Sequence, residues 1–201
     1  MALTLALAPC CAACHAPLAN PSRGPVCPTC WLRVTPLPAL RAYAYDGALR
    51  DIIHAFKYEG RRSLARPLAA LMRAAAGDLL EDADCAVPVP LHPWRRLQRG
   101  FNQAADLAGE LGLPVIHALW RVRWTRQQMG LARDARQQNM RGSMRLSPWP
   151  RYDLRDRIVV LVDDVRTTGA TLEACSAVLR DAGVREVRPV TVAVVPGYSN
   201  G

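Results

Sequence analysis

Hydrophobic positions recur along this chain with the periods of helices and strands. The i, i+3, i+4, i+7 spacing predicts two amphipathic helices with apolar positions at Leu49, Ile52, Ile53 and Phe56, then at Leu64, Leu68, Leu71 and Met72. Residues 102–111 carry a third helical pattern. Residues 171–181 carry a fourth, and Gly183 follows as its C-terminal stop.

Short apolar runs predict the strands between these helices. They are an alternating segment around Tyr43 and Tyr45, a proline-ended run at residues 85–90, and segments at residues 119–124, 158–162 and 187–195. Because strands alternate with helices, we expect an α/β fold whose mainly parallel sheet has helices on both faces. Residues 125–142 are polar, rich in Arg and Gln, and lack an apolar stripe, which predicts a mobile loop.

Length and charge set limits on this picture. The 201 residues, half of them hydrophobic, suffice for one main domain and a minor one, which we place at residues 39–201 and 1–38. The net charge of +9 favours anionic partners without choosing among them. The apolar start has no preceding Lys or Arg, and no later run approaches the roughly 20 apolar residues of a membrane span. We therefore expect a soluble, cytoplasmic protein without a membrane span.

The first thirty residues contain two CxxC pairs. These are Cys11 with Cys14 and Cys27 with Cys30, joined by a loop rich in Pro and Gly. A tight turn can aim both thiolates of such a pair at one tetrahedral ion, and the second pair completes the shell. The sequence thus predicts a small zinc-ribbon-like module with a structural Zn²⁺ site.

Several alternatives remain for these cysteines. Iron fits the same four-sulfur cage, and two redox or disulfide-forming pairs are the non-metal interpretation. Cys10 could replace Cys11, and His15 is a weaker substitute. Cys85 and Cys175 lie in apolar segments and are expected to be buried packing residues.

A second chemical signal follows the apolar run at residues 158–162. Asp163 and Asp164 stand at the end of this predicted strand, and a hydroxyl-rich turn with Gly169 leads into a helix. Backbone N–H groups, threonine hydroxyls and the helix dipole together form a phosphate cradle, while the carboxylates can accept hydrogen bonds from a sugar diol. Ribose 5-phosphate carries both a phosphate and a diol, so this segment predicts a site for it. The alternative is an acidic surface turn followed by an ordinary threonine helix cap.

This segment resembles the phosphoribosyl-diphosphate (PRPP) signature of type I phosphoribosyltransferases, which implies their fold. The resemblance makes Asp163 and Asp164 the candidate catalytic residues. It assigns the ribose and 5′-phosphate to Asp163, Asp164, Val165, Arg166, Thr167, Thr168, Gly169, Ala170 and Thr171. Arg166 departs from the apolar or small residue that is usual at its position, and either contacts a phosphate or faces solvent.

Further motifs resemble the ComF family of competence-associated proteins. They include the paired CxxC, the Val87-to-His92 run, the basic segment through Arg99 to Gln103, and Gln128 to Leu131. By that resemblance the pyrophosphate loop comprises Val89, Pro90, Leu91 and His92, with Arg96 and Arg99 neutralising the diphosphate. A solvated basic turn is the alternative interpretation of the arginines. Residues 125–142 correspond to a flexible loop that closes over the reaction centre.

Lys57, the only lysine, lies near the mouth of the active site by the same comparison, although a cation at a helix C-terminus is an equally good interpretation. In a transferase, Mg²⁺ on the pyrophosphate and ribose hydroxyls would help the leaving group depart. Catalysis would then rest on positioning and electrostatics, and no residue stands out as a general base.

Two functional hypotheses remain open. One is an active phosphoribosyltransferase. Its acceptor is unknown, because the predicted zinc module occupies the position where related enzymes build the hood that recognises the base. The other is a non-catalytic module that senses PRPP or binds single-stranded DNA. The ComF resemblance implies single-stranded DNA and the DNA-uptake and recombination machinery of natural transformation as candidate partners.

Overall fold

The computed structural model describes residues 9–20, 24–91, 97, 99–122, 143–148 and 152–197. Its centre is a five-stranded sheet in the order β1-β2-β7-β6-β3. The strands are β1 (Pro36–Leu37), β2 (Ala42–Ala44), β3 (Cys85–Pro88), β6 (Ile158–Arg166) and β7 (Glu186–Val194). Only the edge pair β1 and β2 is antiparallel among these neighbours, which confirms the mainly parallel sheet.

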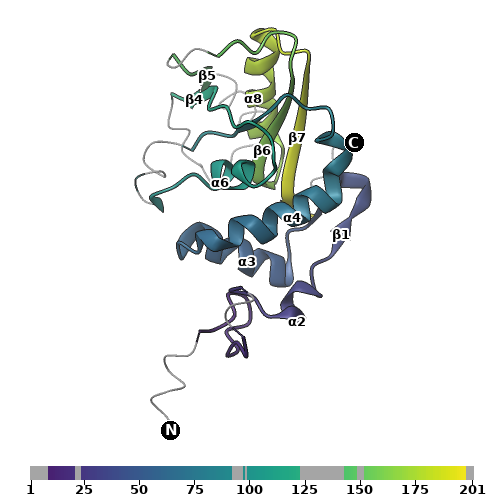
Figure 1. Cartoon of the computed structure of the whole chain (residues 1–201), viewed down its shortest axis with the longest axis vertical. Coiled ribbons are helices and arrows are strands. Elements are labelled where there is room, and N and C mark those ends of the chain that lie inside the picture. The colour runs from purple at the N-terminus through teal and green to yellow at the C-terminus, as the bar shows by residue number, and fades with distance from the viewer. Residues whose placement is uncertain are drawn as a thin grey trace.

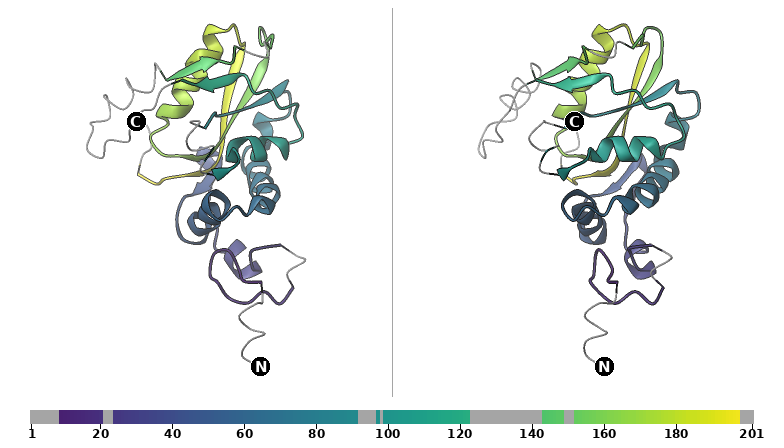
Figure 2. Two further views of the ribbon diagram at one scale, coloured as in Figure 1. Left: turned by 90° about the vertical axis from the view of Figure 1, so that its left-hand side faces the viewer. Right: turned by 60° about the vertical axis from the view of Figure 1, so that its left-hand side comes forward.

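Helices cover both faces of this sheet, as predicted (Figures 1 and 2). One face packs against α3 (Gly47–Tyr58), α4 (Ala65–Ala76) and α6 (Gln103–Gly109), and the other against α8 (Ala170–Asp181). Side chains of β6 alternate between the two cores, with Val160 and Val162 in the first and Val159 and Leu161 in the second. All four are fully buried, so β6 is an interior strand of the sheet, between β7 and β3. Three single-turn helices, η2 (Pro38–Leu40), η3 (Arg62–Leu64) and η4 (Gly77–Leu79), connect these elements.

Local sequence signals account for the ends of two helices. At α6, the Asn102 side chain caps the helix by accepting a hydrogen bond from the Ala104 N–H at 3.1 Å. After α8, Gly183 adopts a left-handed φ of 86°, and the Val184 N–H donates to the Leu179 carbonyl at 3.2 Å. The glycine stop predicted at Gly183 is therefore confirmed.

Strand β6 is longer than its hydrophobic pattern predicts. The apolar run ends at Val162, but backbone pairing with β7 continues from Asp163 opposite Thr191 to Arg166 opposite Val194. An interior strand gains ladder hydrogen bonds from its neighbour whatever side chains it carries, so polarity does not end it. The acidic pair therefore lies near the end of this strand, as predicted, while the strand itself continues to Arg166, beyond the predicted end at residue 162.

A small second sheet lies beside α8. Strand β4 (Leu119–Arg121) is shorter than the predicted segment 119–124, and it pairs antiparallel with β5 (Met144–Leu146). The sequence pattern does not predict β5, because three residues are too few to establish a period. The predicted mobile loop at 125–142 lies outside the described residues.

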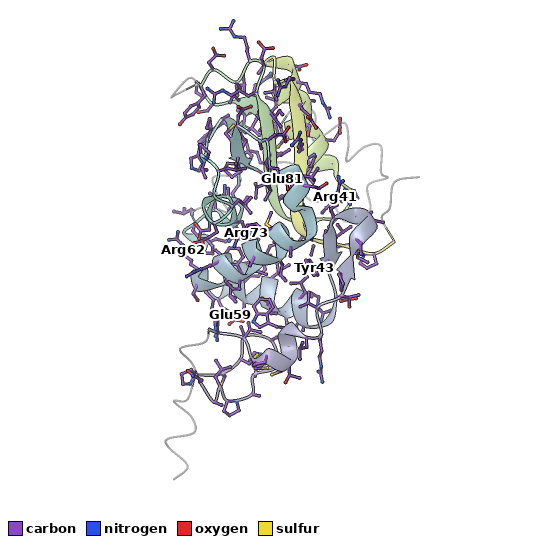
Figure 3. All side chains as sticks on the ribbon, turned by 45° about the vertical axis from the view of Figure 1, so that its right-hand side comes forward. Arg41, Tyr43, Glu59, Arg62, Arg73 and Glu81 are labelled. Atoms are coloured by element: carbon purple, nitrogen blue, oxygen red, sulfur yellow. The ribbon has the colours of Figure 1, made fainter. Side chains whose placement is uncertain are left out.

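The N-terminal segment forms a compact module against α3, which we call the cysteine module (residues 9–20 and 24–34, with α2 at Pro28–Trp31). Its buried residues Cys11, Ala12, Val26 and Cys30 belong to the same hydrophobic cluster as the apolar face of α3. Arg61 adds a polar link, since its Nη1 donates to the Cys10 carbonyl at 3.4 Å and its Nε pairs with Glu59 at 3.1 Å. Figure 3 shows Glu59 where the main domain meets this module.

A domain boundary at residue 38 stays a prediction. Among the described helices, none is long and apolar enough to cross a membrane.

Candidate functional site

The two carboxylates of β6 point to opposite faces of the sheet. Consecutive strand residues alternate in direction, so Asp163 follows Val159 and Leu161 toward α8, while Asp164 faces the side of α3. The contacts agree with this assignment. Asp164 Oδ1 lies 2.7 Å from Lys57 Nζ on α3, whereas Asp163 interacts electrostatically with Cys175 on α8.

Lys57 and Asp164 form an ion pair that is largely withdrawn from water. Their side chains are only 14% and 12% exposed. Lys57 lies in the last turn of α3, where a cation is favoured, and it also contacts Asp164 of the predicted PRPP segment. The pair joins the end of α3 to the end of β6, beside the predicted PRPP loop.

Asp163 has an environment that opposes its ionisation. Burial and the neighbouring charge of Asp164 raise the pKa of Asp163 to about 7, although the Asp164 N–H, Lys57 and Arg121 act in the opposite direction. That backbone N–H donates to Asp163 Oδ1 at 2.8 Å. No pattern in the sequence indicates that Arg121 on β4 lies near Asp163, because its place there depends on the β4–β5 pairing.

The turn after β6 has the form of an anion cradle. Gly169 takes a φ of 76°, which L side chains rarely adopt, and a Cβ built there would meet no atom within 4 Å. Thr168 Oγ1 accepts a hydrogen bond from the Ala170 N–H at 3.4 Å, and α8 begins at Ala170. The first-turn N–H groups of a helix have no intrahelical acceptor, so those of α8 that follow Ala170 are available to a ligand.

The flanks of this turn are held by β7 and by the end of β6. The Val195 N–H donates to the Arg166 carbonyl at 3.0 Å, which continues the β6–β7 pairing to the base of the turn. Arg166, Val165 and Thr171 are half-buried, while Thr167 is exposed. Asp163 and the start of α8 thus lie on one face of the sheet at the carboxyl end of β6, where ligands bind in open parallel sheets.

The predicted pyrophosphate loop begins at the neighbouring strand end. The Val89 N–H donates to the Val162 carbonyl at 2.9 Å, and the Val89 carbonyl accepts from Asn102 Nδ2 at 3.1 Å. Val89 is buried, and Pro90 and Leu91 follow as half-buried residues at the same edge as Asp163. His92 and Arg96 lie outside the described residues.

Arg99 makes a well-defined set of contacts with neighbouring side chains. Its guanidinium stacks 4.7 Å from the centroid of the Tyr58 ring and donates to Tyr58 Oη at 3.0 Å and Gln103 Oε1 at 3.1 Å. These contacts fix the arginine between α3 and α6. Its predicted contact with pyrophosphate stays a prediction.

The four predicted metal ligands come together in the cysteine module. The Sγ atoms of Cys11, Cys14, Cys27 and Cys30 all lie within 4.8 Å of one another. A regular tetrahedron with zinc–sulfur bonds near 2.3 Å requires about 3.8 Å between sulfurs, so the cluster needs little adjustment to take an ion. Cys10 and His15 are not members of this four-sulfur cluster.

Backbone amides stabilise one of these sulfurs as a thiolate. Burial opposes ionisation of Cys11, but hydrogen bonds from the cluster backbone outweigh it and lower its pKa to about 6. The Cys27 and Ala13 N–H groups donate to Cys11 Sγ at 3.3 and 3.5 Å. Burial raises the pKa of Cys30, as do hydrogen bonds with the other three sulfurs. A bound cation would favour the thiolate form of the ligands.

Two cysteines outside the module are fully buried. Cys85 on β3 and Cys175 on α8 both pack in the core on the α8 face, as their apolar surroundings in the sequence predicted. Burial raises the pKa of each thiol, so neither is a reactive nucleophile at neutral pH.

Comparison with known proteins places the chain in a family. The family model described as phosphoribosyl transferase domain matches residues 97–198, which include β6, the turn and α8. Competence protein F of Haemophilus influenzae is 34% identical over 154 residues, covering 72% of this chain and 67% of its own length. The chain belongs to the ComF family of phosphoribosyltransferase-domain proteins. The ComF resemblance of its motifs is thereby confirmed.

Other relatives of this ComF-family protein are more distant. Competence protein ComFC of Bacillus subtilis is 26% identical over 147 residues, which are 70% of this chain and 57% of that protein. The chain therefore spans between about half and two thirds of the length of these relatives. A purine phosphoribosyltransferase crystal structure from Pyrococcus horikoshii matches 68% of this chain and 74% of its own, with 21% identity and a TM-score of 0.40.

Proposed function

We propose that this ComF-family protein binds PRPP at the carboxyl end of β6. The observation that carries the proposal is the placement of Asp163 and the start of α8 on one face of the sheet, joined by a left-handed glycine turn. The 5′-phosphate would take the N–H groups and hydroxyls of residues 167–171, and the ribose hydroxyls would bind Asp163. The pyrophosphate would extend toward Val89 to His92, Arg96 and Arg99.

The donor set at this edge is compatible with Mg²⁺ brought in by the ligand. Among the described residues, the only cluster of three or more metal-ligating side chains is the cysteine cluster, so the acidic pair offers no protein cage of its own. Magnesium commonly binds through one or two carboxylates and substrate phosphates, which fits this arrangement. When bound, the ion would neutralise charge on the leaving pyrophosphate.

The chemistry that follows is phosphoribosyl transfer with loss of pyrophosphate. The bond from the anomeric carbon to pyrophosphate breaks as an acceptor attacks, and positive charge develops on the ribose ring. Asp163 would orient the ring and stabilise that charge, while the cradle holds the 5′-phosphate in place. Nothing in this scheme requires a protein nucleophile.

We further propose that the cysteine cluster holds a structural zinc ion. Four sulfurs from two CxxC pairs complete a tetrahedral shell and leave no open position for a substrate. The two N–H···S hydrogen bonds to Cys11 support a thiolate set of ligands. The ion would then maintain the module against α3, and it would take no part in the transfer.

Transfer is tested by measuring pyrophosphate released from PRPP and Mg²⁺ across nucleobase, amine and nucleic-acid acceptors. We expect release by the wild-type protein and loss of it in the Asp163→Ala/Asp164→Ala variant. PRPP binding by the wild type without release for any acceptor would favour the non-catalytic, PRPP-sensing alternative. Absence of PRPP binding would contradict the proposal itself.

A second candidate function, single-stranded DNA binding, rests on the surface of the β4–β5 sheet. Trp120 is 45% exposed and stands opposite Arg145, also exposed, in the antiparallel register. An aromatic ring beside a cation on a protein of net charge +9 suits a stacked base and its phosphate. Oligonucleotide titration at several salt concentrations tests this, with loss of affinity in Trp120→Ala as the expected result.

A further inference from the structure

The Lys57–Asp164 ion pair has no assigned role in the proposed PRPP site. Lys57 is the only lysine in the chain, and its Nζ lies 2.7 Å from a carboxylate that adjoins the ribose-binding Asp163. An exposed pair of this kind contributes little to stability. This one is mostly buried, so each partner depends on the other for compensation of its charge.

The pleat of β6 separates the two carboxylates. Asp163 faces α8 and the anion cradle, while Asp164 faces α3 and has one oxygen committed to Lys57. A ligand that lies along α8 therefore meets Asp163 first. For Asp164 to bind the same sugar it would have to release a buried ammonium group.

On the basis of the proposed PRPP site, we propose that Asp163 and Asp164 have different roles. Asp163 receives the ribose hydroxyls, whereas Asp164 and Lys57 form a brace between β6 and α3. Lys57 is a positioning residue, because it acts on the ligand through the two carboxylates and not by direct contact.

The brace has an electrostatic as well as a mechanical consequence. Among the residues that the structure describes, the charged and titratable groups that act electrostatically on Asp163 are Asp164 on its own strand, Lys57 on α3, Arg121 on β4 and Cys175 on α8. Asp164 opposes ionisation of Asp163, while Lys57 and Arg121 favour it. Lys57 thereby offsets the neighbouring negative charge and keeps Asp163 able to accept hydrogen bonds at neutral pH.

A set of five variants tests this division. They are Lys57→Met, Lys57→Arg, Asp163→Asn, Asp164→Asn and the double variant Lys57→Met/Asp164→Asn. The matched control is Arg62→Met, which removes an equal charge from the Arg62–Asp106 pair (2.7 Å), whose arginine side chain is 63% exposed. Affinity for Mg²⁺ and PRPP is measured by calorimetry from pH 5.5 to 8.5, and thermal unfolding of each variant is recorded.

We expect Lys57→Met to weaken binding at pH 7 and to move the midpoint of the pH dependence upward. If the pKa of Asp163 rises by one unit from about 7, its ionised fraction at pH 7 falls from a half to about one eleventh, a loss of about fivefold in affinity. Lys57→Arg should restore most of the affinity. Protonation of the ligand's own phosphates is common to all variants and cancels in the comparison.

The double variant separates this role from direct ligand contact. Because it removes both charges of the brace, we expect its pH midpoint to return to that of the wild type and its affinity to lie within about threefold. Arg62→Met should match the wild type. An Asp164→Asn loss as large as that of Asp163→Asn, with no recovery in the double variant, would overturn the division of labour and leave the PRPP site standing. Failure of the wild type to bind PRPP would overturn both.

Discussion

Removing the proposed zinc ion from the cysteine module should destabilise the whole protein and not the module alone. The perturbation is either a chelator or the Cys30→Ser substitution, which takes one sulfur from the four-sulfur cluster. Cys11, Ala12, Val26 and Cys30 are at most 5% exposed and share a hydrophobic cluster with the apolar side chains of α3. If the module opens, that face of α3 becomes exposed to water.

The size of the effect follows from the buried side chains. Burial of Val26 contributes roughly 1.5–3 kcal/mol, and partial exposure of its neighbours on α3 adds a similar amount. A total of about 3–6 kcal/mol in a chain of this length corresponds to a fall of roughly 6–24 °C in melting temperature. The loss should reach the PRPP loop, since α3 carries Lys57 to Asp164.

Scanning calorimetry with parallel elemental analysis measures this effect. Cys10→Ser is the matched control, since Cys10 lies beside the cluster without belonging to it, and its melting temperature and metal content should equal those of the wild type. We expect one mole of zinc per chain and a single unfolding transition that moves down on chelation. A main transition unchanged by chelation would show that the module contributes nothing to the core. Absence of both zinc and iron would refute the metal site.

Two further predictions concern the acidic strand and its turn. Burial raises the pKa of Asp163 to about 7, so the folded protein holds this proton more tightly than the unfolded chain. The free energy of unfolding should therefore fall as the pH rises from about 4 to 7. Asp163→Asn should abolish that decline in denaturant titrations, and an unchanged pH profile would contradict it. Gly169→Ala should cost about 1 kcal/mol in unfolding free energy through its φ of 76°, since a Cβ there meets no neighbour. A variant as stable as the wild type would contradict this.

The order of the main elements and the two ligand motifs could be predicted because both are local in the sequence. Apolar spacing identified α3, α4 and α8, and the CxxC pairs identified four sulfurs that the fold brings together. The end of β6 could not be predicted, because pairing with β7 and not hydrophobicity carries that strand to Arg166.

Contacts between segments that are far apart in the sequence could not be predicted either. Lys57 and Asp164 lie more than a hundred positions apart in the sequence, and no local pattern around either residue indicates that they form an ion pair. Arg121 reaches Asp163 only through the pairing of β4 with β5. Nor does any pattern in the first thirty residues show that the cysteine module shares its core with α3.

The central claim is that the turn between β6 and α8 binds the 5′-phosphate of PRPP, and calorimetry on a Thr168→Glu variant tests it most directly. A carboxylate at this position would repel the phosphate, yet it should not weaken the fold, because acidic residues favour helix N-termini. We predict that wild-type protein and a conservative Thr168→Ser control bind PRPP with Mg²⁺ at one site per chain, and that Thr168→Glu retains its melting temperature and loses binding. Equal PRPP binding by all three proteins would contradict the account.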